Sequence, residues 1–278
     1  MRIFLILISL LLGSCGGGGG GGATPITTYT YSGTANYQTA QFDSSDRITG
    51  FTGQGTDSFN AKVKARDSDS QITYAQFETS VGSVNWSLEN GDDITMFNWG
   101  GAFGANTADE IALVEIDPYS FYGVWNQSMG SNQTRMFAGH GGTQFTTNPA
   151  SHVSSANYSG WAWGALSEIG FEVWPTFANF SASANFSTGS IAISTSNTQR
   201  LDASLNWINT PLANFSGTLT KSGVNNYEYT GAVTDSNGAN GTANLSVYGP
   251  AANSVAGSAT LSNAGNTTRH VVAFGGER

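Results

Sequence analysis

Residues 180–186 read Phe-Ser-Ala-Ser-Ala-Asn-Phe, and this stretch decides the fold class. Its apolar residues occupy the even positions and its polar residues occupy the odd positions. Such a period of two is typical of a strand that buries one face. Residues 201–207, Leu-Asp-Ala-Ser-Leu-Asn-Trp, repeat the pattern. Because apolar residues rarely recur at the 3.6-residue spacing of a helix, the sequence predicts an all-β fold.

Turn-forming residues separate similar runs throughout the C-terminal half. Ser187-Thr-Gly189, Asn209-Thr-Pro211 and Ser236-Asn-Gly238 are three of these turns. From about Ala156 to the C-terminus they leave room for about eight or nine short strands, roughly 10–14 residues apart. This spacing favours an antiparallel sandwich or an up-and-down barrel. Many of the alternating positions on one face of these strands are Ala or Gly, which suits a small barrel whose interior is filled by its own side chains.

The N-terminal half contains strand-like runs with less regular spacing. We expect strands over Thr27–Ala35, Ser58–Ala65, Ile72–Ser80, Ser83–Leu88, Ile111–Ile116 and Phe121–Asn126. The glycine-rich segments at 100–104 and 139–142 are expected to be loops. Residues 148–152 are the expected junction. The sequence therefore divides into an irregular N-terminal β domain over residues 26–152 and a second β domain over residues 153–278.

The chain begins like an exported, lipid-anchored protein. Arg2 precedes an apolar run of about ten residues, which is too short to span a membrane as a helix. Residues 12–15, Leu-Gly-Ser-Cys, match the bacterial lipobox, in which the cysteine thiol takes up a diacylglyceryl group. We expect residues 1–14 to be a signal peptide, Cys15 to be lipidated and the glycine-rich residues 15–25 to be a tether. The alternative is an ordinary cleavage site with an incidental cysteine.

Composition restricts the partners of this chain. Charged residues make up 10% of it, and the formal net charge of −9 argues against nucleic acid as a partner. Residues 26–152 hold thirteen acidic and five basic residues, whereas residues 153–278 hold six and four. Because Cys15 is the only cysteine, no disulfide within the chain can support the fold.

Four segments of the C-terminal half, taken in order, resemble the lipoprotein barrel domain of transferrin-binding protein B and its relatives. Residues 156–164 (ANYSGWAWG) resemble the opening strand of that domain. Residues 186–191 (FSTGSI) resemble its Asp-Phe-Gly-x-Gly hairpin, with Asn185 in place of the acid. Residues 247–257 (VYGPAANSVAG) resemble its Tyr-Gly-Pro segment, and residues 273–278 (AFGGER) resemble its C-terminal tail.

The resemblance implies a fold, a location and a class of function. It implies an N-terminal "handle" domain followed by an eight-stranded antiparallel up-and-down barrel. It also implies a surface-exposed lipoprotein, held in the outer membrane by its N-terminal lipid, that binds a ligand or protein partner. That partner differs between members of the family. The chain is about one lobe long, whereas transferrin-binding members have two.

Motifs for catalysis or metal binding do not stand out in the sequence. It contains no Gly-x-Ser-x-Gly nucleophile elbow. Residues 235–241 carry oxygen ligands, but Ser246 stands where a calcium-binding EF-hand loop needs a glutamate, so a hairpin turn is expected. The histidines His140, His152 and His270 match no zinc spacing. We therefore expect a non-catalytic protein without a cofactor or a metal site.

Aromatic residues of the N-terminal half are the main ligand-binding candidates, because aromatic rings give large contact areas at low entropic cost. Phe121 and Trp125, two members of an alternating set, are expected in the core instead. The residues predicted to contact a ligand are Trp99, Phe103, Tyr119, Tyr122 and His140.

The identity of the ligand stays open at this point. Residues 99–104 and 137–142 are expected to form most of the contact surface, and the acidic excess favours a basic or cationic protein or small ligand. Haem held by His140 is one alternative, because haem-binding relatives of the barrel family exist. A structural surface lipoprotein or adhesin without a soluble ligand is another.

Overall fold

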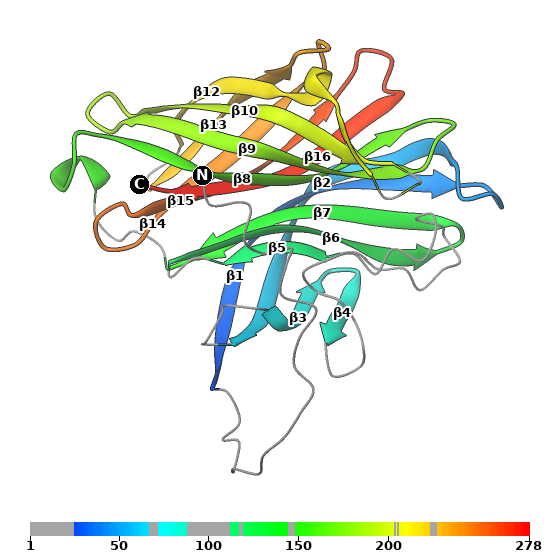
Figure 1. Ribbon diagram of the computed structural model, residues 1–278, viewed down its shortest axis with the longest axis horizontal. Helices are drawn as coiled ribbons and strands as arrows, with labels where there is room; N and C mark the ends of the chain where they lie inside the picture. Colours follow the sequence, from blue (N-terminus) through cyan, green and yellow to red (C-terminus); the bar gives the residue numbers. More distant parts are fainter. Residues whose placement is uncertain are drawn as a thin grey trace, which may run out of the picture.

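The structure, a computed structural model, describes residues 25–66, 72–87, 112–116, 119–143, 148–202, 204, 206–222 and 227–278. These residues form sixteen strands in two antiparallel sheets and two short 3-10 helices, Pro149–Ser151 and Pro211–Ala213. The predicted all-β class is confirmed. Within the described ranges, no helix is long and apolar enough to cross a membrane. Figure 1 shows the two sheets packed against each other.

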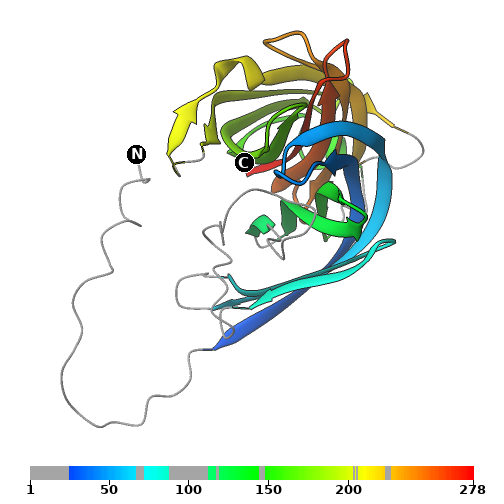
Figure 2. The ribbon, with the colours of Figure 1, turned by 90° about the vertical axis from the view of Figure 1, so that its right-hand side faces the viewer.

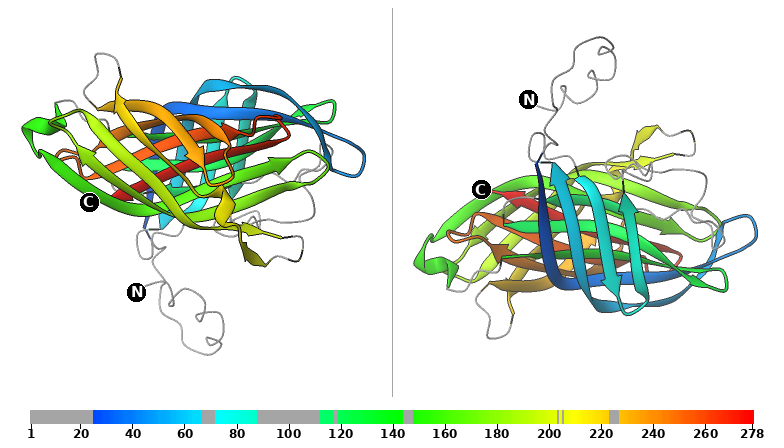
Figure 3. Two further views of the ribbon diagram at one scale, coloured as in Figure 1. Left: turned by 90° about the horizontal axis from the view of Figure 1, so that it is seen from above. Right: turned by 90° about the horizontal axis from the view of Figure 1, so that it is seen from below.

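The N-terminal sheet contains seven strands in the order β4-β3-β2-β1-β7-β6-β5. Seen from below in Figure 3, β1 to β4 lie side by side. The bounds are β1 Ile26–Phe42, β2 Ile48–Arg66, β3 Ile72–Thr79, β4 Gly82–Ser87, β5 Ala112–Ile116, β6 Ser120–Gly130 and β7 Gln133–Gly142.

This sheet curls around a group of aromatic side chains. Phe77 of β3 stacks on Trp125 of β6 with ring centroids 4.3 Å apart, and Phe137 of β7 lies 5.3 Å from Trp125. Because three strands separate β3 from β6, the sheet has to bend for these rings to meet. Phe59 and Phe121 join the same buried cluster. The expectation that Phe121 and Trp125 belong to the core is confirmed.

The C-terminal sheet closes into an eight-stranded antiparallel barrel. Its strand order is β10-β12-β13-β14-β15-β16-β8-β9, and β9 pairs back with β10. Figure 2 shows this closed ring of strands. The short strand β11, Trp207–Asn209, adds to β10. The bounds are β8 Ser155–Glu168, β9 Val173–Asn185, β10 Ser190–Leu201, β12 Phe215–Lys221, β13 Glu228–Asp235, β14 Asn240–Tyr248, β15 Ser254–Ser262 and β16 Thr268–Glu277.

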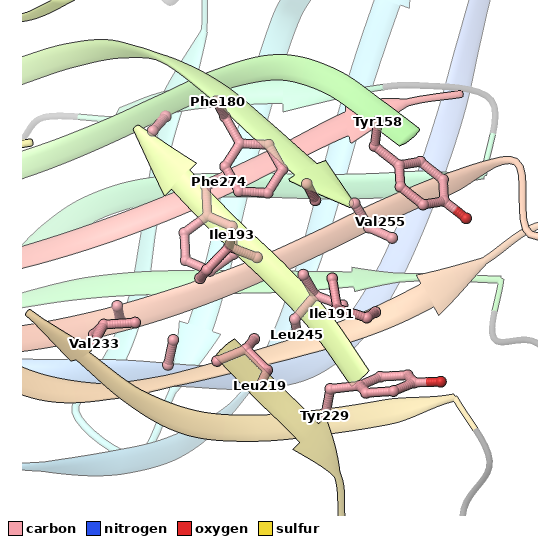
Figure 4. Packing of buried hydrophobic residues seen from close by; sticks show 14 of the residues in the cluster. Tyr158, Phe180, Ile191, Ile193, Leu219, Tyr229, Val233, Leu245, Val255 and Phe274 are labelled. Atoms are coloured by element: carbon pink, nitrogen blue, oxygen red, sulfur yellow. The ribbon is translucent and has the colours of Figure 1, made fainter. Parts of the chain in front are cut away.

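Side chains fill the interior of the barrel. Along β9, the even positions from Phe180 to Ala184 are buried, and Ser181 and Ser183 between them are exposed. The inward rings of Phe180 and Phe274 stack with centroids 4.9 Å apart. Figure 4 shows these rings among the aliphatic side chains of the same cluster. The barrel is therefore a packed core, as its small inward residues predicted.

The N-terminal sheet packs against the outside of the barrel. A second hydrophobic cluster contains Val124 and Met136 from the sheet together with Val271 and Ala273 from β16. Backbone hydrogen bonds also join the two parts, since Ile48 N–H donates to Phe171 O over 2.9 Å. Each sheet also has a core of its own. Division into two domains at residues 148–152 is compatible with these cores and stays a prediction.

One expectation for the N-terminal half is wrong. Residues 139–142 are the end of strand β7, and the sequence pattern did not predict that strand at all. Its last positions are three glycines and a histidine, which resemble a loop in sequence. The seven strands pair in one sheet, with register shifts in the β1–β2, β2–β3 and β6–β7 pairings. Residues 100–104, the other expected loop, lie outside the described residues.

Candidate functional site

Three of the predicted site residues lie where the N-terminal sheet meets the barrel, which we call the junction. Tyr119 immediately precedes β6 and is half-buried, Tyr122 is buried in β6, and His140 is buried in β7. Tyr122 and His140 are directly opposite each other in the β6–β7 ladder. Trp99 and Phe103 lie outside the described residues, as does the lipidation residue Cys15. Their roles stay predictions.

The structure corrects the environment expected for His140. Its side chain is 7% exposed, whereas the sequence suggested an exposed loop. The Nδ1 atom of His140 lies 3.4 Å from Oγ of Ser258 on β15. Burial lowers the pKa of His140 to about 4, because desolvation penalises the charged ring. A neutral imidazole enclosed between two sheets is not open to a flat ligand, so haem binding at His140 is not favoured.

Polar side chains at the junction pair across it. The amide of Asn36 on β1 donates to Oγ of Ser258 over 3.1 Å. The amide of Gln38, two residues further along β1, donates to Oγ of Ser167 on β8 over 2.8 Å. Buried polar groups with such partners fix one relative position of two packed sheets, because a displaced sheet leaves them unsatisfied.

Two glycines make room for rings, Gly139 in the core of the N-terminal sheet and Gly275 at the junction. A Cβ atom on Gly139 would lie 2.7 Å from the ring of Trp125, and one on Gly275 of β16 would lie 2.4 Å from the ring of Tyr122. At each of these positions an aromatic side chain of the protein itself occupies the space that a side chain would need. Tyr122 is accordingly a packing residue of the junction, and a ligand contact by it stays untested.

Several solved structures are similar to this fold. Transferrin binding protein B from serogroup B Neisseria meningitidis is 12% identical, with a TM-score of 0.45, covering 90% of this chain and 76% of that one. The same protein from Haemophilus parasuis, as a Trp-to-Ala mutant, is 9% identical, with a TM-score of 0.41 and coverage of 90% and 76%. The haemoglobin receptor HpuA from Kingella denitrificans, solved with human haemoglobin, is 10% identical, with a TM-score of 0.40 and coverage of 92% and 89%.

Transferrin-binding protein B is also the protein after which the family resembled by the four C-terminal sequence segments is named. Identities this low concern the fold alone, and they leave the partner of this chain open. No protein-family model and no curated protein sequence matches the chain.

An open hollow of about 660 Å³ lies on the outer face of the N-terminal sheet, and we call it the sheet hollow. Side chains from three neighbouring strands line it: Ser32 and Thr34 of β1, Ser58 and Asn60 of β2, and Glu78 of β3. Thr34 is paired with His140 in the β1–β7 ladder, so the hollow adjoins the junction. Sequence reasoning missed this site, because Ser, Thr and Asn in a strand read as ordinary solvent-facing residues.

The barrel interior offers no comparable space. Its most polar part lies around His270, whose Nε2 atom is 2.8 Å from Oγ1 of Thr176. Burial lowers the pKa of His270 to about 3. Within the described residues, no group of three or more His, Cys, Asp or Glu side chains is arranged to hold a metal ion. Two open hollows of the described residues, of about 660 and 600 Å³, lie on outer faces of the sheets.

Proposed function

We propose that this protein is a lipid-anchored surface protein of the bacterial outer membrane that binds a protein partner through its N-terminal sheet, without catalysis. The observation that carries the proposal is the open polar hollow of the N-terminal sheet, which carries the exposed carboxylate of Glu78. The barrel interior is packed with side chains. A small solute carried inside the barrel, as in lipocalins, is incompatible with that packing.

The chemistry of the sheet hollow supports a basic partner. Glu78 is exposed there, and the other lining side chains are hydroxyls and an amide that accept hydrogen bonds. The described residues of 26–152 carry five acids and five bases, so the acidic excess of this half belongs to segments outside the described residues, and its support for a basic partner rests on the sequence alone. Attraction between exposed charges raises association rates and weakens with added salt.

Partner binding can be tested by reversing one charge. The lipidated chain is immobilised in detergent and exposed to the protein mixture of the fluid around the cells. Retained proteins are identified by mass spectrometry and the binding of each is then titrated. Glu78→Lys should weaken binding at least tenfold, which corresponds to about 1.4 kcal/mol. Glu168→Lys makes the same charge change at an exposed position on the barrel and should have little effect. Equal binding by both variants would remove the sheet hollow from the contact surface.

The lipid anchor needs a separate experiment. Cys15→Ser removes the thiol that accepts the diacylglyceryl group, so the variant should remain an uncleaved precursor and should not incorporate labelled palmitate. Protease treatment of intact cells should then degrade the wild-type protein if it is surface-exposed. Palmitate labelling that persists in the Cys15→Ser variant contradicts the anchor.

A further inference from the structure

A cluster of aromatic rings lies on the outer surface of the barrel. It shares no residue with the sheet hollow, and its Trp163 also packs against the hydrophobic cluster at the junction. Trp161 and Trp163 of β8 flank Phe177 of β9, with ring centroids 5.1 and 4.6 Å from it. The ring of Trp207 on β11 approaches Phe177 edge-on at 6.2 Å. Trp207 is 37% exposed, and the other three side chains are half-buried. We call this group the aromatic cluster.

Strand register places amide side chains among these rings on the same face. Asn179 is opposite Trp161, and Gln199 of β10 is opposite Phe177. The amide of Gln199 donates to Oδ1 of Asn209 on β11 over 3.2 Å, at the surface. The aromatic cluster therefore presents ring surfaces bordered by neutral hydrogen-bonding groups.

A hydroxyl-lined hollow of about 600 Å³ continues from the aromatic cluster along the same strands. Asn179 leads to it, because Ser181, the next outward residue of β9, lines the hollow. The other outward side chains that line it are Asn157, Ser183, Ala192, Ser194, Ser216 and Thr218. The wall of β9, β10 and β12 faces away from the N-terminal sheet, at the top of Figure 1 and toward the viewer in the left part of Figure 3.

The charge of this face indicates the kind of ligand. In the described part of β8, β9, β10 and β12, no outward position carries a charged side chain, although the whole chain has a net charge of −9. Arg200 of β10, next to Gln199, lies beside this face with its guanidinium 4.6 Å from the centroid of the Trp174 ring. The outward positions themselves offer a charged ligand no counter-charge.

A stable protein interface needs about 800 Å² on each side around an apolar centre, whereas here the aromatic rings lie at one end of the face. The hollow beyond them alternates Ser, Thr and Asn side chains with apolar carbon, including that of Ala192. Neutral polyhydroxylated molecules match this face, since their C–H faces pack on rings and their hydroxyls bond to Ser, Asn and Gln.

We propose that the outer wall of the barrel binds a neutral oligosaccharide, with sugar rings packed on the aromatic cluster and neighbouring units in the hydroxyl-lined hollow. This site is separate from the sheet hollow and does not depend on the partner proposed there. A face of this kind would let the protein hold a neutral glycan while the N-terminal sheet remains free.

The test uses the full chain in a zwitterionic detergent without a sugar headgroup. The probes are linear hexasaccharides of glucose, galactose, mannose and N-acetylglucosamine, followed by tryptophan fluorescence and by saturation-transfer NMR. At least one probe should bind saturably, and its affinity should change less than twofold between low and high salt. Trp161→Ala and Trp207→Ala should each lower the affinity at least tenfold.

A second variant covers the case in which a tryptophan change disturbs folding. Ser183→Arg places a bulky charge in the hollow at an exposed position and should also lower affinity at least tenfold. Met129→Ala, which shortens an exposed side chain on the N-terminal sheet, should leave affinity unchanged. The proposal is overturned if no neutral hexasaccharide binds, if only a charged hexasaccharide such as one from hyaluronan binds, or if Trp207→Ala lowers self-association of the chain instead.

Discussion

Glycine residues set how closely rings and strands approach in this molecule. At Gly139 the space that a side chain would occupy is taken by Trp125, whose stacking with Phe77 and Phe137 organises the N-terminal core. At Gly275 the space is taken by Tyr122 at the junction. Both glycines are therefore required by packing, and neither has a backbone φ that requires glycine.

Gly139→Ala should destabilise the protein by about 1–3 kcal/mol, because the added methyl group overlaps the ring of Trp125. Urea denaturation followed by tryptophan fluorescence measures the change. Gly50→Ala is the matched control, since a Cβ there meets nothing within 4 Å. Gly50→Ala should leave the free energy of unfolding unchanged or raise it slightly, because alanine gives the unfolded chain less conformational freedom than glycine does. Equal destabilisation by the two variants contradicts the packing role of Gly139.

Two buried histidines give the fold a dependence on pH. Burial lowers the pKa of His140 to about 4 and that of His270 to about 3, from an ordinary 6.5. Between about pH 6.5 and 4 the unfolded chain therefore binds more protons at His140 than the folded chain does, and stability falls as the pH falls. For His140 the full loss is on the order of 3 kcal/mol.

His140→Gln should reduce this pH dependence without abolishing it, because glutamine keeps a neutral polar group near Ser258 and takes up no proton, whereas His270 keeps its own contribution. The measurement is the urea midpoint at several pH values between 4 and 7.5. His152→Gln, which changes an exposed histidine, should leave the slope as in the wild type. A wild-type slope in His140→Gln would show that His140 is accessible to protons in the folded state.

At the scale of elements, each sheet closes around its own rings. The stack of Phe77 on Trp125 connects β3 with β6, two strands that share no hydrogen bonds. In the barrel, the stack of Phe180 on Phe274 connects β9 with β16 across the interior. The two stacks lie in different clusters, so a cavity in one should loosen its own sheet first.

Phe77→Leu and Phe274→Leu test this separation as a reciprocal pair. Each replaces a fully buried ring by a smaller side chain, with an expected cost of about 1–3 kcal/mol. Hydrogen exchange should accelerate most in β1–β7 for Phe77→Leu and most in β8–β16 for Phe274→Leu. Uniform acceleration in both variants would mean that the two sheets open as one unit.

The elements themselves could largely be predicted from the sequence, and the two exceptions have physical causes. Residues 201–207 alternate like a strand, but Leu201 ends β10 and Trp207 begins β11, because the Asp202 carboxylate accepts hydrogen bonds from the backbone N–H groups of Ser204 and Asn206 and holds a turn there.

Alternation in 180–186 predicted β9, because every second residue there faces a packed interior. Strand β7 ends in Gly139-His-Gly-Gly142, where side chains are missing because neighbouring rings and backbone occupy their space. A strand without side chains carries no alternation, and it reads as a loop.

At the scale of the whole molecule, the candidate sites depend on pairings that no local pattern encodes. The sheet hollow joins residues of β1, β2 and β3, and the aromatic cluster joins residues of β8, β9 and β11. Tryptophans at 161 and 163 were correctly expected in the barrel strands. Their contact with Phe177 and Trp207 follows from strand register, which the sequence alone does not reveal.

The junction decides how the two proposed domains depend on each other. Residues 153–278 contain the whole barrel and its core, so this fragment should fold alone and give a far-UV spectrum of β structure. Without the N-terminal sheet, however, the junction side of β16 loses its cover, and Val271 and Ala273 reach the surface. We therefore expect the isolated barrel to self-associate, since exposed apolar patches drive association.

Val271→Thr separates the folding of the barrel from its association. In the full chain Val271 is fully buried at the junction, so a hydroxyl there should cost about 1–3 kcal/mol. In fragment 153–278 the same change lies at the surface, where it should leave the unfolding midpoint nearly unchanged and should reduce self-association measured by sedimentation. A far-UV spectrum of coil or helix for the fragment contradicts the domain division. A large loss of stability from Val271→Thr in the fragment would mean instead that this position is buried within the barrel itself.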